Sequence, residues 1–336
     1  MVEDITGFQE IINMIEERRH NAYRKVNEEM IFLYWDIGKY VTEKIKQDNW
    51  GSKTVENLAA YIKNKYPTLK GFNRAGIYRM KQFYETYCEF PEIVSTLLRQ
   101  INWSNHVEIL SKVKTIEAKK FYIALSIKEQ YSARELSRQI RSGYYERYMI
   151  SKNAPFSQKL LINETEIPNS RFLDIYSFEF LNLPLEHSEK DFRKAIMVNF
   201  KKFILEIGKS FTFIGEEYRI QVGGEDFYID LLFYNRDLSC LVAFELKIGA
   251  FAPEYISKMD FYLEALDRQV KKEHENPSVG IILCTNRNEE VVKYSMNRSM
   301  SPTLVSEYQV KLIDTKILEH KLKEIKEYVE ESKMVD

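Results

Sequence analysis

The sequence predicts an α + α/β protein, with an all-helical N-terminal domain followed by an α/β domain built on a central mixed sheet. Its 336 residues suit two units of roughly 100 to 200 residues each. Apolar residues recur at helical spacing in the first half, whereas stretches rich in β-branched and aromatic residues occur only in the second. With 44% hydrophobic and 29% charged residues, the chain has the composition of an ordinary folded protein.

The N-terminal domain is expected to span residues 1–150. Apolar residues that suit buried helical stripes occur in two groups, namely Ile11, Ile12 and Ile15, and then Ile31, Leu33, Tyr34 and Ile37. A break around Pro67 and Gly71 separates a helix over 55–65 from a second helix over 73–87. The layout is that of two helices joined by a short turn.

Basic residues concentrate in this domain although the net charge of the whole chain is only -1. Residues 51–150 hold 17 Lys and Arg against 9 Asp and Glu, an excess of +8. Arg74, Arg79 and Lys81 lie on the second helix of the pair and are candidates for nucleic-acid binding. A solvated basic face, and a helix that serves packing or dimerisation, are the alternatives that charge and spacing leave open.

Residues 151–170 are rich in Asn, Pro and Ser and predict a linker, so the second domain is expected over 171–336. Its predicted order is a helix, three strands, a helix and a strand, an αβββαβ core with additions. The helices are expected over 189–207, 254–271 and 289–297 and at the C-terminus, and the strands over 218–222, 227–234, 241–247, 279–284 and 308–313.

Three ionisable residues lie within the apolar strands of this domain. If the strands flanking Asn235 and Cys240 form a hairpin in which these two residues pair, then Asp230 faces Glu245, and Lys247 points to the same face. Charges buried without partners are too costly to be incidental. The pattern therefore indicates a functional site, although a structural ion pair between Lys247 and a carboxylate is the alternative.

Two carboxylates suit the oxygen-only coordination of Mg²⁺, for which Mn²⁺ is an expected substitute. A metal held by Asp230 and Glu245 would activate a water for hydrolysis, and Lys247, with a pKa lowered by burial beside the metal, would orient or deprotonate that water. Glu206, at the end of the preceding helix, is a candidate third ligand, and an exposed helical glutamate is its alternative. Other Glu-x-Lys matches, which begin at Glu117, Glu319 and Glu324, fall in segments expected to be helical.

Longer segments carry a resemblance to a known family. They are FYIDLLFY at 227–234, ELKIG at 245–249, KMDFYL at 258–263 and VGIILC at 279–284, with YWDIG at 34–38, GFNR at 71–74 and INWS at 101–104 in the first half. The chain resembles the YhcG-like family of the PD-(D/E)XK nuclease superfamily over nearly its whole length. The resemblance implies a restriction-endonuclease-like fold and metal-dependent hydrolysis of phosphodiester bonds, with DNA as the expected substrate and RNA as the alternative.

The resemblance also implies roles for individual residues. Asp230 and Glu245 would be metal ligands and Lys247 the catalytic lysine, while Lys258 and Tyr262 match a helical signature that flanks the site. Glu206 fits the helical acid of the first motif. The chain departs from the family pattern at Glu216 and Glu217, where a basic residue followed by glutamine is expected. A catalytically silent or partner-activated nucleic-acid-binding protein on the same fold is the alternative function.

The sequence also bears on location and assembly. It lacks apolar runs of membrane-spanning length and a secretory signal, and its three cysteines are too far apart to suggest a disulfide framework, so the expected compartment is the cytoplasm. We read the cysteines as packing residues. Because cutting both strands of a duplex ordinarily needs two sites, a homo-oligomer is expected, with DNA as the partner and no membrane.

Overall fold

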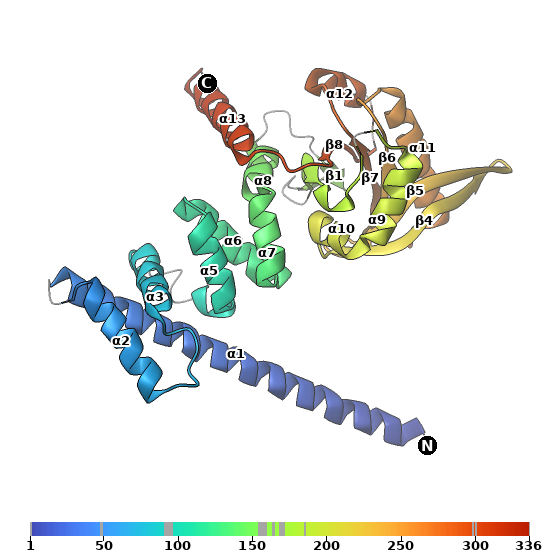
Figure 1. The fold of residues 1–336 in the computed structure, drawn as a ribbon. Helices are drawn as coiled ribbons and strands as arrows, with labels where there is room; N and C mark the ends of the chain where they lie inside the picture. The colour runs from blue at the N-terminus through green and yellow to red at the C-terminus, as the bar shows by residue number, and fades with distance from the viewer. Residues whose placement is uncertain are drawn as a thin grey trace. The chain divides into compact units, whose positions relative to one another are not determined.

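The computed structural model describes residues 2–47, 50–90, 97–153, 160–162, 165–167, 172–184, 186–297, 299 and 301–335 (Figure 1). The chain divides into two compact units, Met1–Ile140 and Arg141–Asp336. The division falls before residue 150 because helix α8 (Tyr144–Asn153) packs on the sheet of the second unit and on helix α13 (Thr315–Val335).

The first unit is helical, as the sequence predicts. Its helices are α1 (Val2–Lys46), α2 (Ser52–Lys65), α3 (Arg74–Tyr87), η1 (Leu98–Gln100), α5 (Trp103–Lys112), α6 (Ile116–Glu129) and α7 (Ala133–Arg141). The helix expected over 73–87 is confirmed, and it begins at Asn73 because the side chain of this residue accepts a hydrogen bond from the Gly76 amide at 2.8 Å.

The stripes expected on α1 are only partly buried. Ile31 and Tyr34 lie in the core, but Ile11, Ile12, Ile15 and Leu33 are exposed, so the expectation is wrong for these four residues. The cause is that α1 packs only with its C-terminal half, on α3 and η1, where Asn27 donates hydrogen bonds to the carbonyls of Arg99 and Ile101. The N-terminal half of α1 extends past the other described helices of this unit (Figure 1).

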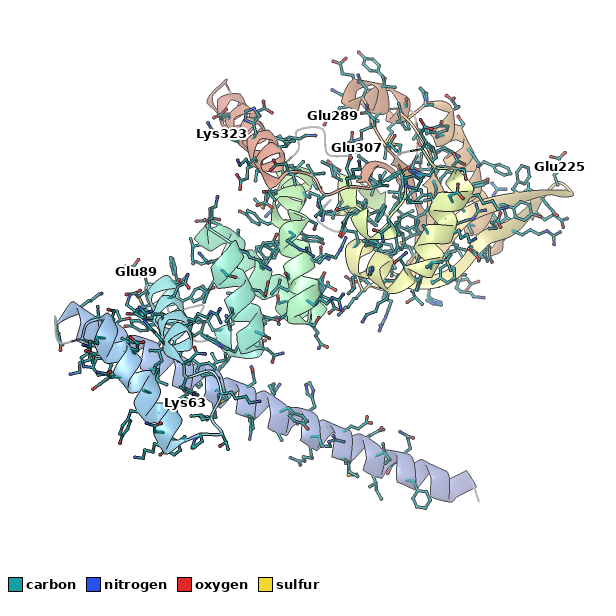
Figure 2. All side chains as sticks on the ribbon, viewed as in Figure 1. Lys63, Glu89, Glu225, Glu289, Glu307 and Lys323 are labelled. Carbon is teal, nitrogen blue, oxygen red and sulfur yellow. The ribbon has the colours of Figure 1, made fainter. Side chains whose placement is uncertain are left out.

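The second unit is built on a six-stranded mixed sheet. Its strands are β3 (Ile175–Ser177), β4 (Phe211–Val222), β5 (Glu225–Asn235), β6 (Cys240–Leu246), β7 (Asn276–Cys284) and β8 (Thr303–Gln309), in the order β3-β8-β7-β6-β5-β4. β4, β5 and β6 are antiparallel, whereas β6, β7, β8 and β3 run parallel. The expected mixed sheet is confirmed. The β4–β5 hairpin extends beyond the sheet and carries Glu225 near its tip (Figure 2).

Helices cover both faces of this sheet. Helices α9 (Glu189–Val198) and α10 (Phe200–Ile207) pack on one face with the short helix η3 (Glu179–Leu181), and α11 (Glu254–Gln269) and α12 (Glu289–Met296) pack on the other. Helix α11 approaches β7 closely because Gly280 has no side chain. A Cβ atom at this position would collide with the side chain of Met259. Asp230 on β5 and Glu245 on β6 therefore lie in a sheet whose two faces are both covered by helices.

Three expectations for this half need correction. The helix expected over 189–207 is two helices that meet at Asn199, and the last strand covers Thr303–Gln309 rather than 308–313. The polar residues near the start of β8 obscure the strand, which is fixed by parallel pairing with β7. The expected linker contains a small antiparallel hairpin of β1 (Leu160–Ile162) and β2 (Thr165–Ile167), and its residues 154–159, 163–164 and 168–170 lie outside the described residues.

All three cysteines are free thiols. Cys240 and Cys284 are buried packing residues as expected, but Cys88 is exposed, so the expectation of a packing role is wrong there. Within the described ranges, none of the helices has the length and apolar character that crossing a bilayer requires.

Candidate active site

The β5–β6 hairpin has the register that the sequence predicts. Asn235 pairs with Cys240, and the ladder continues through Leu231 and Phe244. The turn is held by the side chain of Asn235, which accepts hydrogen bonds from the amides of Asp237 and Leu238 at 3.1 Å. This short connection fixes which residues of the two strands meet.

The ladder ends one step before the expected pair of Asp230 and Glu245. There the Asp230 carboxylate accepts a hydrogen bond from the Leu246 amide through Oδ2 at 2.9 Å. The alternation of β5 also changes at Asp230: Ile229 packs in the same apolar cluster as Leu232, whereas Leu231 packs in the cluster on the other face. Asp230 therefore links β5 to β6 through its side chain, at the point where the backbone pairing of these two strands stops.

Glu245 is the most buried acid of the expected trio, with a side chain only 2% exposed. The Lys247 ammonium lies 3.0 Å from Glu245 Oε1, and the Lys258 ammonium, from α11, bonds to the same oxygen. The other oxygen, Oε2, has no hydrogen-bond partner within the described part of the chain. A buried carboxylate oxygen without a partner is costly unless another ligand satisfies it.

The two lysines are held in their charged form. Burial acts to lower the pKa of Lys247, but the charges of Glu245 and Glu189 outweigh it, so the pKa lies above its usual value. Burial opposes the hydrogen bond and charge of Glu245 at Lys258 in the same way, and the pKa of Lys258 rises to about 12. Two carboxylates surround Lys247 in this arrangement, so a lowered lysine pKa beside a bound metal stays a prediction.

Helix α9 brings two further charged residues to the site. It starts at a capping box, in which Ser188 and Asp191 exchange side-chain and backbone hydrogen bonds. Glu189 in its first turn lies 3.2 Å from the Lys247 ammonium. One turn later, Arg193 pairs with Asp230 Oδ1 at 2.9 Å and with Glu217 Oε1 at 2.7 Å.

Sequence reasoning did not find Glu189 and Arg193 as site residues. Their spacing of four residues places both on one face of a helix, but charged residues of this kind are common on exposed helix faces. The capping box at Ser188 was the available signal for where the helix begins. Glu217 was noticed only as a departure from the family pattern, and its pairing with Arg193 could not be inferred from one sequence.

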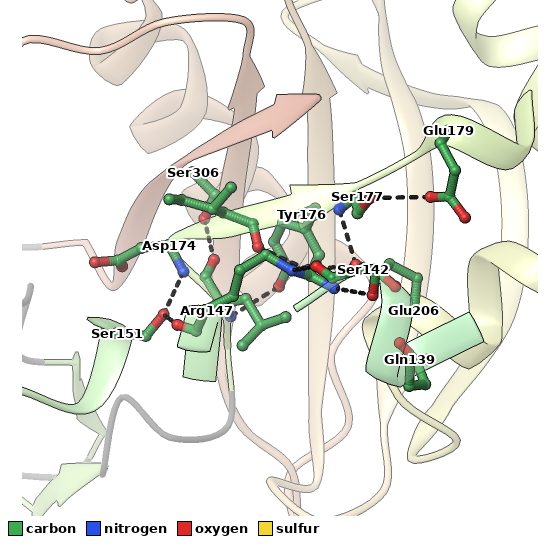
Figure 3. Close-up of polar contacts among 12 residues, drawn as sticks. Gln139, Ser142, Arg147, Ser151, Asp174, Tyr176, Ser177, Glu179, Glu206 and Ser306 are labelled. Atoms are coloured by element: carbon green, nitrogen blue, oxygen red, sulfur yellow. Dashed lines mark hydrogen bonds and ion pairs between the residues drawn. The ribbon is translucent and has the colours of Figure 1, made fainter. Parts of the chain in front are cut away.

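Glu206 does not join the other candidates. Its Oε1 lies 2.6 Å from Arg147 Nη1, with both side chains fully buried, and it accepts a hydrogen bond from the Ser177 amide at 2.8 Å (Figure 3). Arg147 is held in turn by the carbonyls of Ser142 and Ile175. The expectation of a metal ligand at Glu206 is wrong because its charge is neutralised by Arg147, and Glu189 is the helical acid near Lys247 instead.

Lys258 and Tyr262 lie beside the trio, as the resemblance implies. The Lys258 ammonium lies 5.2 Å from the centroid of the Tyr262 ring. The Tyr262 hydroxyl donates a hydrogen bond to the Tyr228 carbonyl at 2.8 Å, and burial raises the pKa of Tyr262. Lys258 thus contacts a candidate ligand directly, whereas Tyr262 ties α11 to β5.

The residues present fit a divalent cation in part. Asp230 and Glu245 offer oxygen donors on adjacent strands, and the unpartnered Oε2 of Glu245 is the atom that a cation would satisfy. Across the ranges that the structure describes, no three His, Cys, Asp or Glu side chains are grouped as a metal site. Water and substrate oxygens would have to complete the coordination, as is usual for Mg²⁺.

The candidates for nucleic-acid binding lie on α3 of the first unit. Arg74 and Arg79 are exposed, and the Arg74 guanidinium lies 5.6 Å from the centroid of the Tyr78 ring. Lys81 is partly buried and forms an ion pair with Glu85 at 2.7 Å. Two of the three cations are therefore presented to solvent.

Comparisons with known proteins agree with this architecture. Residues 169–323 match the family model described as the YhcG PDDEXK nuclease domain, and residues 10–147 match the DUF1016 N-terminal domain. A protein of Escherichia coli (strain K12) named "Putative nuclease YhcG" is 28% identical over an alignment 363 residues long. The alignment covers 97% of this chain and 96% of that protein. The crystal structure of a repair endonuclease from Pyrococcus abyssi aligns over 37% of this chain and 46% of that one, with 21% identity and a TM-score of 0.25.

The mixed sheet, its flanking helices and the matched models define a PD-(D/E)XK nuclease domain that follows a helical domain. Within that class, the chain belongs to the YhcG-like family, because both of its halves match the corresponding models and its relative aligns over nearly the full length. Membership of a nuclease family indicates nuclease activity for this chain.

Proposed function

We propose that the protein is a Mg²⁺-dependent nuclease that hydrolyses phosphodiester bonds of DNA, with Mn²⁺ as a substitute. The observation that carries the proposal is the Glu245 carboxylate, buried beside two charged lysines with Oε2 lacking a hydrogen-bond partner in the described structure. An ordinary structural ion pair would not place two lysines on one oxygen and leave the other unsatisfied. Family membership supports the nuclease class.

Asp230 and Glu245 are the residues that would hold the metal. A bound divalent cation supplies a water of lowered pKa and offsets charge that develops on the phosphate. Lys258 takes Oε1 of Glu245, which leaves Oε2 for the cation. Asp230 already accepts the Leu246 amide through Oδ2, so Oδ1 is the oxygen that it would offer.

Lys247 would act as a fixed positive charge. Its ammonium, held between the Glu189 and Glu245 carboxylates, would donate a hydrogen bond to the attacking water or to a phosphate oxygen. Glu189 and Glu245 accept from its ammonium on two sides and so limit its orientation. Lys247 is a catalytic residue in this proposal, and Glu189 is its positioning residue.

The helical unit is proposed to contact the nucleic acid through Arg74 and Arg79, which are exposed on α3. Exposed guanidinium groups on a helix are well suited to phosphates. Two copies of the chain would supply the two sites that cutting a duplex requires, so we propose a homodimer as the active form. Light scattering of the purified protein measures that state.

The experiment that tests the function is a digestion panel. Full-length protein is incubated with single-stranded, double-stranded and branched DNA and with RNA of the same sequences, in Mg²⁺, in Mn²⁺ and in EDTA. Cleavage of DNA in either metal and none in EDTA is the expected result. Cleavage of RNA alone would show that the substrate is RNA and not DNA. Cleavage in EDTA would contradict the proposed dependence on a metal.

Metal binding without cleavage of any substrate would favour the alternative, a catalytically silent or partner-activated protein on the same fold. One feature of the site makes this alternative worth measuring: Arg193 pairs with the Asp230 oxygen that the metal would need. A titration of Mn²⁺ by calorimetry, run beside the digestion panel, separates loss of metal binding from loss of chemistry.

A further inference from the structure

Arg193 holds two carboxylates at once. Its Nη1 lies 2.9 Å from Asp230 Oδ1 and its Nη2 lies 2.7 Å from Glu217 Oε1. The side chains of Arg193 and Asp230 are each 15% exposed, whereas that of Glu217 is 61% exposed. The guanidinium therefore spans from a shielded candidate metal ligand to an acid near solvent.

The contact between Arg193 and Asp230 concerns the proposed metal site directly. Asp230 Oδ2 accepts a hydrogen bond from the Leu246 amide, a contact between side chain and backbone that also joins β5 to the end of β6. A cation would therefore bind the other oxygen, Oδ1, and this is the oxygen that Arg193 contacts. A guanidinium and a divalent cation on the same oxygen repel each other, so their binding is expected to be competitive.

Glu217, the more exposed partner of Arg193, has an unusual backbone conformation. Glu217 has φ +44°, a left-handed value that is uncommon for a residue other than glycine, and it lies in β4 between residues that pair with Ile229 and Leu231 of β5. Such conformations cost free energy and tend to persist where a functional constraint maintains them. Here the conformation goes with a carboxylate that reaches the second nitrogen of Arg193.

We propose that Arg193 competes with the divalent cation for Asp230 Oδ1, and that Glu217 is the carboxylate onto which Arg193 withdraws when the cation binds. The inference rests on the proposed function, since it assigns the metal to Asp230. It makes Glu217 a positioning residue that tunes cation affinity without contacting the cation.

The test measures the affinity of the full-length protein for Mn²⁺ by calorimetry in the absence of nucleic acid. Arg193→Gln removes the competitor, so tighter Mn²⁺ binding is expected. Glu217→Gln removes the withdrawal partner and keeps Arg193 on Asp230, so binding weaker by about two- to fivefold is expected, the size of one partly exposed ion pair.

The double variant separates this mechanism from a general effect of charge. In an Arg193→Gln background, Glu217→Gln has no competitor to release, so its effect on Mn²⁺ affinity should disappear. If Glu217 acted only by its own charge, the same two- to fivefold loss would persist in that background and overturn the proposal. Asp226→Asn is the matched control, because Asp226 lies on β5 in a comparable 2.9 Å pair with Arg219 and away from the site.

Two further measurements keep the result interpretable. Circular dichroism melts check that each variant folds, and Arg193→Met, which removes the charge but keeps a long side chain, replaces Arg193→Gln if that variant unfolds. Wild-type protein that binds no Mn²⁺ would overturn this proposal together with the proposed metal dependence. Wild-type protein that binds Mn²⁺ and cleaves DNA, with no coupling between Arg193 and Glu217, would overturn this proposal alone.

Discussion

Arg147 and Glu206 form an ion pair of 2.6 Å in which neither side chain is exposed to solvent. The pair joins α8 to α10, and Arg147 also donates to the Ile175 carbonyl of β3. A buried pair of this kind is worth little against an apolar replacement of both partners, but removing one partner leaves an uncompensated charge. Its role is therefore to fix how α8 meets the nuclease sheet.

Glu206→Gln is expected to lower the free energy of unfolding by about 3 kcal/mol, because Arg147 would remain buried without its counter-charge. Urea denaturation followed by far-UV circular dichroism measures the change. The folded variant should bind Mn²⁺ as the wild type does, since Glu206 is paired with Arg147 and is not one of the residues proposed to hold the metal. A large loss of Mn²⁺ affinity with unchanged stability would restore Glu206 as a ligand.

His106 is expected to make the helical unit less stable in mild acid. Burial lowers the pKa of His106 from 6.5 to about 4, and its Nε2 donates to the Leu98 carbonyl at 2.7 Å. Between these two pKa values the unfolded chain binds a proton that the folded chain does not, so stability falls as the pH decreases. The expected loss attributable to this group is about 2 kcal/mol between pH 7 and pH 5.

Denaturation followed by tryptophan fluorescence measures this loss, because Trp35, Trp50 and Trp103 all lie in the first unit. His106→Gln is the control: its amide can still donate a hydrogen bond, but it does not titrate. The variant should lose about 2 kcal/mol less than the wild type over the same pH interval. Equal pH dependence in both proteins would show that His106 is not the responsible group.

Tyr262→Phe is expected to cost about 1 kcal/mol of stability and to leave the cleavage rate within threefold of the wild type. The reason is that the Tyr262 hydroxyl bonds to the Tyr228 carbonyl, so its removal leaves a backbone acceptor unpaired but takes nothing from the carboxylates. Thermal melting and single-turnover cleavage measure the two effects. A rate loss of a hundredfold with unchanged stability would instead make Tyr262 a catalytic residue.

Arg74→Gln and Arg79→Gln should each weaken binding of duplex DNA and reduce the slope of log K against log salt by about 1. Both side chains are exposed, whereas Lys81 is paired with Glu85 at 2.7 Å, so Lys81→Gln should have the smaller effect. Fluorescence anisotropy at several salt concentrations gives these slopes. Unchanged slopes in both arginine variants would favour a packing or dimerisation role for α3.

The sequence predicted the parts of the fold that depend on local pattern. The hairpin register followed from the turn between Asn235 and Cys240, and the two-residue spacing at the end of β6 put Lys247 beside Glu245 as expected. The Glu-x-Lys matches at Glu117, Glu319 and Glu324 lie in helices α6 and α13, as their patterns indicated. Strand alternation and turn chemistry are local properties, which a single sequence contains.

Contacts between distant segments could not be predicted in this way. Glu206 and Glu189 both follow helical patterns, and only the packing of α8 against α10 decides that Glu206 meets Arg147. The apolar stripe at Ile11 to Ile15 has the spacing of a buried face, yet no described part of the first unit covers it. Such partners lie far away in the sequence, so spacing alone does not identify them.

The most direct test of the central claim is single-turnover cleavage of duplex DNA in Mg²⁺ by the wild type, Asp230→Asn and Asp226→Asn. Asparagine at 230 can still accept the Leu246 amide, so the strands should stay joined while the metal loses a charged ligand. We predict that Asp230→Asn lowers the rate at least about a hundredfold, whereas Asp226→Asn cleaves as the wild type does. An Asp230→Asn protein that cleaves DNA at the wild-type rate would contradict the assignment of the metal site.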